Sequence, residues 1–349
     1  AGRMKNGGLD MNLLDALSRR AEAFIDSFRR EQVPPGGIFA AIKRDIHDYI
    51  DANYRGPIPG EVVKQVYNEI LTAALSVVRP LKVVYMGPEG TYSNQATMEF
   101  FGATVESVPM RTISDVFHDV EAGKADFGVV PVENSNEGAV TYTLDELIET
   151  DLQIVAEKYT RISCSVLSKD GSLESVGKLY THPQPLGQCK GWLRKNLPNA
   201  EICIVESTSR AAEIASGEKG AAAIGSSVAA GIYGLNVLAD HVEDSRQNYT
   251  RFFIIGRDRT KPTGKDKTSI VFSIKDRPGA LFDVLSHFKN TGINMTKIES
   301  RPDKKKMWEY NFFIDFMGHR EDTKVGEVLA KIKSDAIFLK VLGSYPVAN

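Results

Sequence analysis

The spacing of apolar residues changes near Leu81, and this change constrains the fold more than any other feature of the chain. Before Leu81, apolar residues recur at helical spacing in three stretches, separated by proline- and glycine-rich breaks at 34–37 and 56–60. After it, short runs of β-branched residues alternate with turns and helical patterns. The sequence therefore predicts an α/β protein with mostly parallel sheets, preceded by an all-α segment whose first helix is short.

Three domains follow from this pattern. Residues 1–80 form the helical segment, and residues 81–257 contain the alternating strands and helices. A polar linker with five basic residues leads to residues 267–349, which read as strand, helix, strand, strand, helix, strand. This βαββαβ order is the ferredoxin-like arrangement. The strands expected in the middle domain are 82–86, 127–132, 177–180, 200–205, 221–224 and 252–255.

Composition argues against several classes of partner. The 349 residues carry a formal net charge of -2, so no broad positive field is expected to hold nucleic acid or an anionic membrane. No apolar segment reaches the ~20 residues that span a bilayer, and the polar N-terminus lacks the apolar core of a secretory signal. The cysteines and histidines are scattered without metal-ligand spacing. We therefore expect a cytoplasmic protein without a metal site.

Three polar motifs lie far apart in the chain. They are 87–93 (GPEGTYS), 131–135 (PVENS) and 248–252 (NYTRF). Together they make the chain resemble the prephenate dehydratases. The resemblance implies a two-lobed fold like that of periplasmic solute-binding proteins, with the ligand between the lobes. It also implies the decarboxylative dehydration of prephenate to phenylpyruvate, carbon dioxide and water, a reaction for which no cofactor is expected.

The resemblance makes Thr250 the catalytic threonine. A threonine hydroxyl is too weak an acid to transfer a whole proton at neutral pH, so we expect it to act by hydrogen bonding or as a relay from a stronger acid. Glu133 and water are the candidates for that stronger acid. The alternative is that Thr250 only favours a strand, as β-branched residues do.

Arg251 follows Thr250 directly and is a candidate for clamping a substrate carboxylate in bidentate fashion. Successive side chains of a regular strand point to opposite faces, so both residues face the substrate only if the backbone is irregular there. Otherwise Arg251 is a partner in a structural ion pair. Phe252 completes the motif and joins the substrate-binding set, although its apolar ring favours packing over chemistry.

The other substrate-binding candidates lie where predicted strands end and helices begin, which is where open α/β sheets form their sites. Hydroxyls and free amides at such turns can receive an anion, and ordinary helix capping is the alternative. The candidates are Thr91, Ser93, Asn134 and Ser135 in the first lobe, and Thr181, Gln184, Gln188, Ser207, Thr208 and Ser209 in the second.

The C-terminal domain carries two further motifs, 276–282 (DRPGALF) and 299–302 (ESRP). Together they resemble the ACT domains that sense phenylalanine. This implies that L-phenylalanine binds as an allosteric effector across a dimer interface, and that the protein is a homodimer or homotetramer. The alternative is that these residues only make a turn and a core. The effector-binding candidates are Pro278, Gly279, Ala280, Leu281, Asn294, Glu299 and Ser300.

The helical segment occupies the position of the chorismate mutase domain in fused bacterial enzymes, but it matches that domain poorly. Ala74 and Val78 stand where a serine and a glutamine are expected, and Arg20, Lys43 and Arg44 are uncertain remnants of the cationic seat. We therefore expect mutase activity to be absent or vestigial and the segment to serve dimerisation. Three alternatives stay open: a bifunctional enzyme, an arogenate dehydratase, and a non-catalytic amino acid sensor.

Overall fold

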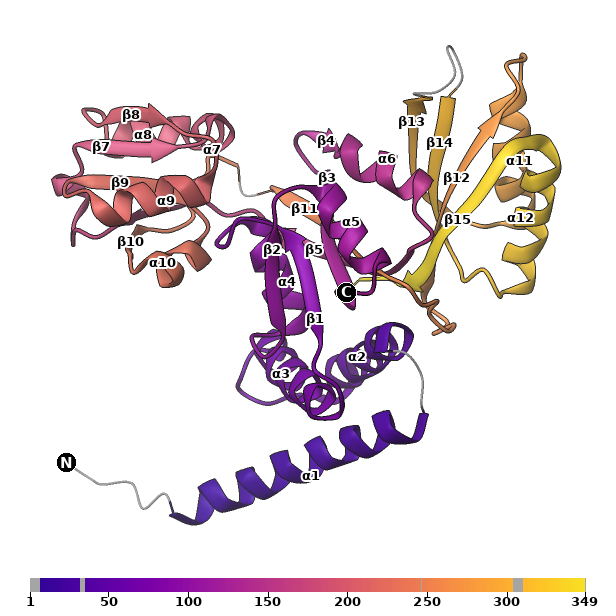
Figure 1. Ribbon diagram of the computed structural model, residues 1–349, viewed down its shortest axis with the longest axis horizontal. Helices are drawn as coiled ribbons and strands as arrows, with labels where there is room; N and C mark the ends of the chain where they lie inside the picture. Colours follow the sequence, from indigo (N-terminus) through magenta and orange to yellow (C-terminus); the bar gives the residue numbers. More distant parts are fainter. Residues whose placement is uncertain (1–6, 32–34, 246, 304–309, 349) are drawn as a thin grey trace.

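The computed structural model describes residues 7–31, 35–245, 247–303 and 310–348, and arranges them in four units (Figure 1). The helical unit comes first in the chain and lies at the bottom of the view. Two lobes of α/β structure follow, with the first lobe in the centre and the second at the left. The C-terminal unit packs on the opposite side of the first lobe from the second lobe. The first lobe therefore contacts every other unit.

The helical unit consists of α1 (Gly7–Glu31), α2 (Pro35–Asn53) and α3 (Gly60–Val78). At 25 residues, α1 is not the short helix that the sequence predicted. Pro34, which belongs to the first predicted break, lies outside the described residues. α2 begins at Pro35, and proline suits the first turn of a helix because its missing N–H would have no partner there.

The first lobe is built on a sheet with strand order β2-β1-β3-β11-β5, and β4 pairs with β3. β11 runs antiparallel to both β3 and β5, because the chain leaves the lobe after β5 and returns to it through β11. The elements are β1 (Lys82–Met86), α4 (Tyr92–Phe101), β2 (Glu106–Met110), α5 (Ile113–Glu121), β3 (Phe127–Asn134), β4 (Gly138–Ala139), α6 (Thr141–Glu149), β5 (Gln153–Arg161) and β11 (Tyr249–Gly256).

The second lobe has strand order β10-β6-β9-β7-β8. β6 is antiparallel to β9, and β9 is parallel to β7. Both sheets are thus mixed rather than mostly parallel, which corrects the expectation. The elements are β6 (Ser165–Ser168), the 3₁₀ turn η1 (Leu173–Ser175), β7 (Lys178–Thr181), α7 (Pro183–Gln188), α8 (Lys190–Asn196), β8 (Glu201–Ile204), α9 (Thr208–Gly217), β9 (Ala221–Gly225), α10 (Ser227–Tyr233) and β10 (Asn236–Ala239).

The C-terminal unit has the predicted βαββαβ order, with an antiparallel sheet arranged β13-β14-β12-β15. Its two helices cover one face of the sheet around a core of Phe272, Phe288 and Phe316. The elements are β12 (Asp266–Ile274), α11 (Ala280–Thr291), β13 (Met295–Pro302), β14 (Tyr310–Met317), α12 (Thr323–Asp335) and β15 (Ala336–Pro346).

The other face of the C-terminal sheet packs directly on the first lobe. Phe313, Leu342 and Tyr345 share one buried core with Phe253 and Ile255 of β11. A side chain at Gly343 would place its Cβ 2.2 Å from the carbonyl oxygen of Ile154 in β5, so glycine lets the two strands approach. The two units therefore form a continuous body joined through a hydrophobic core.

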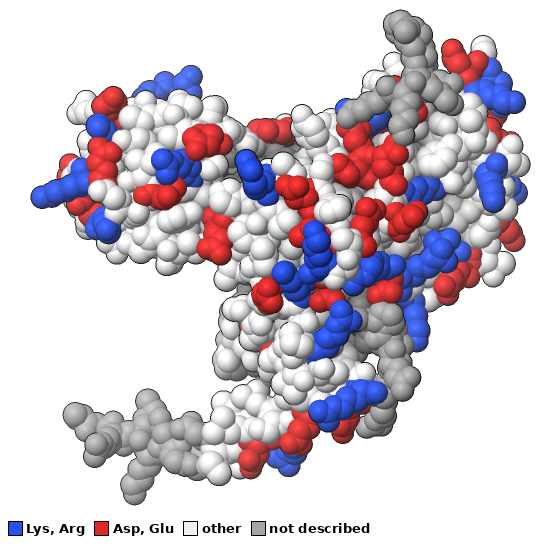
Figure 2. All heavy atoms as spheres, in the orientation of Figure 1, with Lys and Arg blue, Asp and Glu red and all other residues white. Residues whose placement is uncertain are grey.

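Charges of both signs are mixed over the face shown in Figure 2, as the small net charge suggested. Among the described residues, no group of three or more His, Cys, Asp or Glu side chains is placed to hold a metal ion. None of the described helices is both long and apolar enough to cross a membrane.

Candidate active site

Thr250 and Asn134 form a hydrogen-bonded pair where β11 and β3 meet the second lobe. They are direct partners in the antiparallel ladder. Asn134 Nδ2 donates to Thr250 Oγ1 at 2.8 Å and to Asn248 Oδ1 at 2.9 Å, while Asn134 Oδ1 accepts from the backbone N–H of Asn136. The amide orientation is therefore consistent with all of its neighbours. Because Thr250 Oγ1 accepts from Asn134, its own proton is free to be donated.

The pair lies at the lobe crossing, which we define as segments 162–164 and 247–249, where the chain passes between the lobes. The two segments are joined by a hydrogen bond from Ile162 N to Asn248 O at 2.8 Å. Thr250 is 8% exposed and Asn134 is 9% exposed, so both just reach the surface. Asn248 belongs to the third motif but was not among the predicted site residues, and its fixed amide explains why the motif includes it.

Ser135 has a structural role at the crossing. Its hydroxyl donates to Gln247 O at 3.2 Å and accepts from Tyr249 N at 3.0 Å. The backbone N–H of Ser135 also donates to Tyr249 O at 2.9 Å. Ser135 therefore fixes the start of β11, and its hydroxyl is already engaged by the backbone. Asn134 and Ser135 do not precede a helix as expected, because α6 begins only at Thr141.

The first motif forms the turn where the two lobes touch. Thr91 caps α4, donating to Pro88 O at 2.9 Å and accepting from Asn94 N at 3.4 Å, and Ser93 is buried in the first turn. Gly90 has a φ of 80° and leaves room for Ala229 of α10, whose Cβ would lie 3.2 Å from a Cβ at Gly90. Glycine is needed here for both reasons.

The second lobe brings one predicted residue close to the crossing. Gln188 Oε1 lies 4.0 Å from the Sγ of Cys164, and Tyr92 of the first lobe donates to Ser163 O at 3.0 Å beside it. Neither Tyr92 nor Cys164 was predicted as a site residue. Burial raises the pKa of Tyr92 well above its usual value, and the nearby Cys164 adds to this effect. Tyr92 is therefore a neutral hydrogen-bonding group at neutral pH.

The other predicted residues of the second lobe serve the ends of its helices. Thr181 is fully buried and donates to His182 O at 3.1 Å, while the backbone N–H of Gln184 donates to the His182 ring. Ser207 caps α9 by accepting from Arg210 N at 3.0 Å. Thr208 and Ser209 begin that helix, and Ser209 is completely buried. Ser207 therefore acts as an ordinary helix cap, which was the alternative to substrate binding.

Glu133 lies next to Asn134 but faces the other side of the sheet. Its carboxylate forms an ion pair with Lys297 in the C-terminal unit, and Glu133 Oε2 lies 2.9 Å from Lys297 Nζ. The geometry of this contact is not that of a hydrogen bond. A carboxylate on the Thr250 side comes instead from α4, since Glu99 Oε2 accepts from Thr160, the partner of Thr250 on β5, at 3.2 Å. The geometry therefore does not support Glu133 as the proton source for Thr250.

Arg251 also faces away from Thr250, and it is 4% exposed. Its guanidinium contacts Glu157 Oε2 at 2.7 Å, Asp315 Oδ2 at 2.5 Å and the Tyr345 hydroxyl at 3.0 Å. These partners occupy the fork that a substrate carboxylate would need. We therefore correct the substrate clamp to a structural ion pair, because the strand alternates its side chains here. Phe252 is 1% exposed and packs in the core beneath Thr250, so it is corrected to a packing residue.

Comparison with known proteins decides the family. The model of the prephenate dehydratase family matches residues 83–260, and the model of the ACT domain matches residues 268–334. A bifunctional chorismate mutase/prephenate dehydratase of Aquifex aeolicus is 50% identical over 295 residues, which cover 84% of this chain and 82% of that protein. The chain belongs to the prephenate dehydratase family.

Two further relatives of this prephenate dehydratase extend the likeness. A bifunctional chorismate mutase/prephenate dehydratase of Pseudomonas aeruginosa is 41% identical over 353 residues, covering 99% of this chain and 97% of that protein. The solved structure of a prephenate dehydratase from Arthrobacter aurescens in complex with L-Phe has a TM-score of 0.70 and 33% identity, covering 76% of this chain and 90% of that chain. The likeness to the Pseudomonas protein includes the helical unit.

The ACT domain contains a hollow of about 260 Å³ at the start of α11. Gly279, Ala280 and Leu281 line it together with Tyr310 and Phe312 of β14. Gly279 has a φ of 81°, which favours glycine in the turn before the helix. The structure thus gathers three of the predicted effector residues. The remaining four, which do not line this hollow, are Pro278, Asn294, Glu299 and Ser300.

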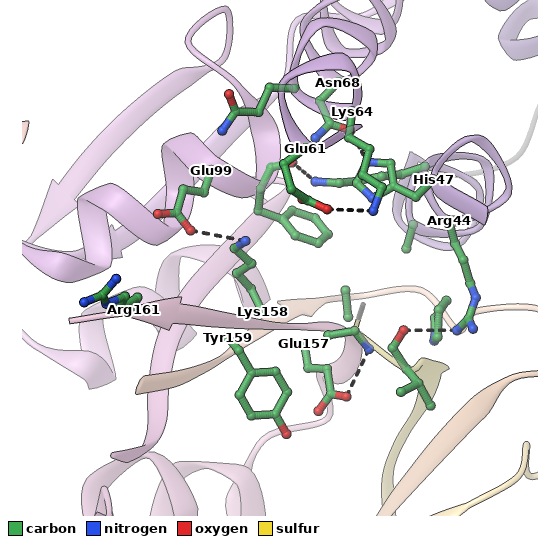
Figure 3. A pocket seen from close by; sticks show the side chains of 18 of the residues that line it. Arg44, His47, Glu61, Lys64, Asn68, Glu99, Glu157, Lys158, Tyr159 and Arg161 are labelled. Atoms are coloured by element: carbon green, nitrogen blue, oxygen red, sulfur yellow. Dashed lines mark hydrogen bonds and ion pairs between the residues drawn. The ribbon is translucent and has the colours of Figure 1, made fainter. Parts of the chain in front are cut away.

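A second hollow, of about 640 Å³, lies between the helical unit, β5 and the C-terminal tail (Figure 3). Its cations already have partners: Lys64 pairs with Glu61 at 2.8 Å, and Lys158 pairs with Glu99 at 3.2 Å. Arg44 donates to the backbone carbonyl of Val347 at 3.1 Å. The Arg44 contact joins the helical unit to the C-terminal tail. The hollow lies on the opposite side of α2 from a third one, which is lined by α1.

The third hollow lies among the three helices and is lined by Arg20, Asp45, Tyr49, Tyr54 and Tyr67, among others. Lys43 and Arg44 do not line it, because Lys43 points toward the first lobe and Arg44 toward the C-terminal tail. Lys43 donates to the carbonyl of Phe100, and burial lowers its pKa well below the usual value. Arg20 is therefore the one cation among the described side chains that line this hollow.

Proposed function

We propose that the chain dehydrates and decarboxylates prephenate at the lobe crossing, with Thr250 as the hydrogen-bond donor to the departing hydroxyl. The observation that carries this role is the hydrogen bond from Asn134 Nδ2 to Thr250 Oγ1. It orients the threonine oxygen and leaves the threonine proton for the substrate. Asn248 holds the same asparagine from the other side, so the pair is fixed before any substrate arrives.

The reaction breaks two bonds on the prephenate ring. The bond to the carboxylate carbon breaks, and its electron pair enters the ring as carbon dioxide leaves. The bond between the opposite ring carbon and its hydroxyl oxygen also breaks. The departing hydroxyl takes up a proton and leaves as water. Aromatisation provides the driving force. A hydrogen bond from Thr250 stabilises the negative charge that develops on the departing oxygen, and the proton that converts the departing hydroxide to water comes from solvent.

The test is turnover of the purified full chain on prephenate and on arogenate, with Thr250→Ala beside the natural protein. We expect prephenate to be the better substrate. Thr250→Ala should reduce kcat by about 10²- to 10⁴-fold, because a positioned proton donor contributes that much, while substrate binding is nearly kept. Thr250→Ser, which keeps the hydroxyl, should retain much of the activity.

Other outcomes identify the alternatives. An arogenate dehydratase would show the higher kcat/KM on arogenate. An amino acid sensor would bind its ligand without turnover of either compound. Unchanged kcat in Thr250→Ala, with the variant folded, would contradict the assigned role of the threonine.

Phenylalanine is proposed as the feedback effector, bound at the hollow lined by Gly279, Ala280 and Leu281. The likeness to a prephenate dehydratase solved with L-Phe supports this assignment. The start of α11 presents free backbone N–H groups to a carboxylate, and the aromatic rings of Tyr310 and Phe312 supply an apolar wall. Assembly into a homodimer or homotetramer, with the other effector candidates at the interface between copies, belongs to the same proposal.

Chorismate mutase is the second candidate function, because the Pseudomonas bifunctional enzyme matches the chain over its whole length. The contacts of the helical unit favour its loss. A dianionic substrate needs several cations, and the hollow among the three helices has Arg20 with three tyrosines. We propose that the unit retains the fold of the mutase without its activity.

A further inference from the structure

Two ion pairs join the first lobe to the ACT domain directly beneath the Asn134–Thr250 pair. Glu133 of β3 and Arg251 of β11 are partners across one ladder, and Lys297 of β13 and Asp315 of β14 are partners across another. Glu133 pairs with Lys297 at 2.9 Å, and Arg251 pairs with Asp315 at 2.5 Å. The four side chains thus form a complementary quartet, with one positive and one negative group on each sheet.

The Arg251 half of the quartet is buried and fully hydrogen-bonded. Tyr345 OH, 3.0 Å from Arg251, also lies 2.6 Å from Ser269 Oγ, and Ser269 donates to Asp315 at 2.5 Å. Every side chain in this set is less than 10% exposed. Charged hydrogen bonds in such surroundings are strong and directional, so they fix the position of Arg251 more tightly than a surface pair would.

The quartet is one residue away from the catalytic pair on both strands. Asn134 follows Glu133 on β3, and Thr250 precedes Arg251 on β11. Side chains alternate between faces, so the rung that presents Asn134 and Thr250 to the lobe crossing is followed by the rung that presents Glu133 and Arg251 to the ACT domain. A shift of the second rung moves the first with it, because the two share their peptide bonds.

The ladder itself is irregular at this point. The register between β11 and β3 changes between Arg251 and Phe252, so the regular pairing from Phe252 onward is interrupted just before the catalytic rung. A bulge of this kind bends a strand and re-aims its side chains, which is why bulges are common next to active sites. β11 keeps its regular pairing with β5 through this rung, so the irregularity lies on the β3 side, where the Glu133–Lys297 pair adds a contact from the ACT domain.

We propose that Lys297, Asp315 and Tyr345 of the ACT domain are positioning residues for the dehydratase reaction, which act on Thr250 and Asn134 through Glu133 and Arg251. The proposal rests on the role of Thr250 given above. It makes the ACT domain a structural part of the active site in addition to any effector site it contains. The three residues touch no substrate, and their effect on the chemistry comes from the placement of one hydroxyl.

The experiment compares charge reversal with charge removal in the less buried half of the quartet, in the same chain as the natural protein. Lys297→Glu is compared with the double variant Glu133→Gln/Lys297→Gln, which removes both charges of the pair and leaves no like charges on either sheet. Lys297→Glu places a carboxylate next to those of Glu133 and Asp315 and should lower kcat by about tenfold to a hundredfold, because a catalytic group displaced by about 1 Å loses that much. KM should stay within about twofold of the natural value in both variants, and the double variant, whose two amides can still hydrogen-bond, should keep most of the natural kcat.

Lys331→Glu serves as the matched control. Lys331 is an exposed lysine of α12, which covers the opposite face of the ACT sheet, so its reversal changes the domain charge equally without touching the quartet. Its kcat should equal that of the natural protein. A second variant, Tyr345→Phe, removes one hydroxyl from the buried half with little change of shape, and it should lower kcat severalfold at constant KM.

The possible outcomes distinguish a positioning role from a direct role of Glu133 and from a purely structural role of these contacts. If the double variant is as inactive as Lys297→Glu, Glu133 acts by its own carboxylate and the positioning role is overturned. Natural kcat in Lys297→Glu and Tyr345→Phe overturns it as well, even if the unfolding midpoint falls, since the contacts are then only structural. If Lys297→Glu does not fold, Tyr345→Phe decides. Failure of the proposed function appears elsewhere, as unchanged kcat in Thr250→Ala.

Discussion

At the residue scale, one asparagine decides which hydrogen bonds Thr250, the proposed catalytic threonine, can make. Asn134 has both amide hydrogens committed, one to Thr250 and one to Asn248, and its oxygen accepts from the backbone. The second motif thus holds Thr250 with its asparagine, while its glutamate contacts the ACT domain. Strand alternation produces this division, and the same rule places Thr250 and Arg251 on opposite faces.

Replacing Asn134 tests this arrangement. Asn134→Ala should lower kcat by about tenfold to a hundredfold and the free energy of unfolding by about 1–3 kcal/mol, because Asn248 loses its buried partner. Steady-state kinetics and urea denaturation measure the two effects. Asn136→Ala is the control, since Asn136 is exposed and its side chain makes one long contact of 3.4 Å with Ser135. An Asn134→Ala variant as active as the control would contradict the prediction.

The ionisation of Tyr345 makes the stability of the interface depend on pH in the alkaline range. Burial, followed by the Asp315 carboxylate, raises the pKa of this tyrosine well above its usual value. The folded state therefore keeps a proton that the unfolded chain releases near pH ~10. Its contribution to stability is complete below that pH and falls as the pH rises above it.

The corresponding measurement compares the natural protein with Tyr345→Phe between pH 9 and 11. The unfolding free energy of the natural protein should fall more steeply, by up to about 1.4 kcal/mol per pH unit, because phenylalanine has no proton to release. Parallel slopes for the two proteins would show that Tyr345 ionises equally well in the folded state.

At the element scale, the close approach of β15 to β5 joins the ACT domain to the first lobe. Gly343 has no room for a side chain against Ile154. The Phe253 and Tyr345 rings pack beside this contact with their centroids 5.9 Å apart. The linker before β12 is also held in place, because Thr260 donates to Ser344 and Arg257 donates to Val120. The joint is thus a packed interface and not a loose tether.

Gly343→Ala should destabilise this joint. A Cβ 2.2 Å from the Ile154 oxygen forces the strands apart, and overpacking of this kind costs about 1–3 kcal/mol of unfolding free energy. Urea denaturation measures the change. Gly326→Ala is the matched control, because no atom lies within 4 Å of the new Cβ and alanine favours the interior of α12. Equal stability of the two variants would contradict the close-contact argument.

At the scale of the whole molecule, the helical unit is held by its contacts with other units. Arg44 donates to the C-terminal tail at Val347, and Lys43 donates to Phe100 of α4. Two of the cations expected to remain from a mutase site are therefore used to attach the unit, Lys43 to the first lobe and Arg44 to the C-terminal tail. Figure 3 shows Arg44 beside the hollow at this junction. This use is consistent with a structural role for the helical unit within the chain.

An assay of chorismate consumption tests the loss of mutase activity. We expect conversion to be absent or far slower than turnover on prephenate, because the hollow among the helices offers few cations to a dianion. A chorismate turnover in the ordinary enzymatic range, about 1–10³ s⁻¹, would overturn this expectation. Thr250→Ala is a useful control, since it should leave any mutase activity unaffected.

The sequence by itself determined the classes of structure and the family. Hydrophobic periodicity was enough for the helical unit and for the βαββαβ order of the C-terminal unit, because local spacing directly reflects which face each element buries. It did not reveal β2 and β6, which are only five and four residues long, or β5, whose second half is largely charged and polar. The three motifs carried the family resemblance, and that resemblance pointed to Thr250 and Asn134.

Only the tertiary structure decided what each motif residue does. Whether Glu133 and Arg251 meet a substrate or another domain depends on which face of β3 and β11 each occupies and on what packs there. The answer lies in β13, β14 and β15, which are more than forty residues further along the chain. Partners so far apart in sequence leave no local pattern, so their pairing becomes visible only when the two sheets are in contact.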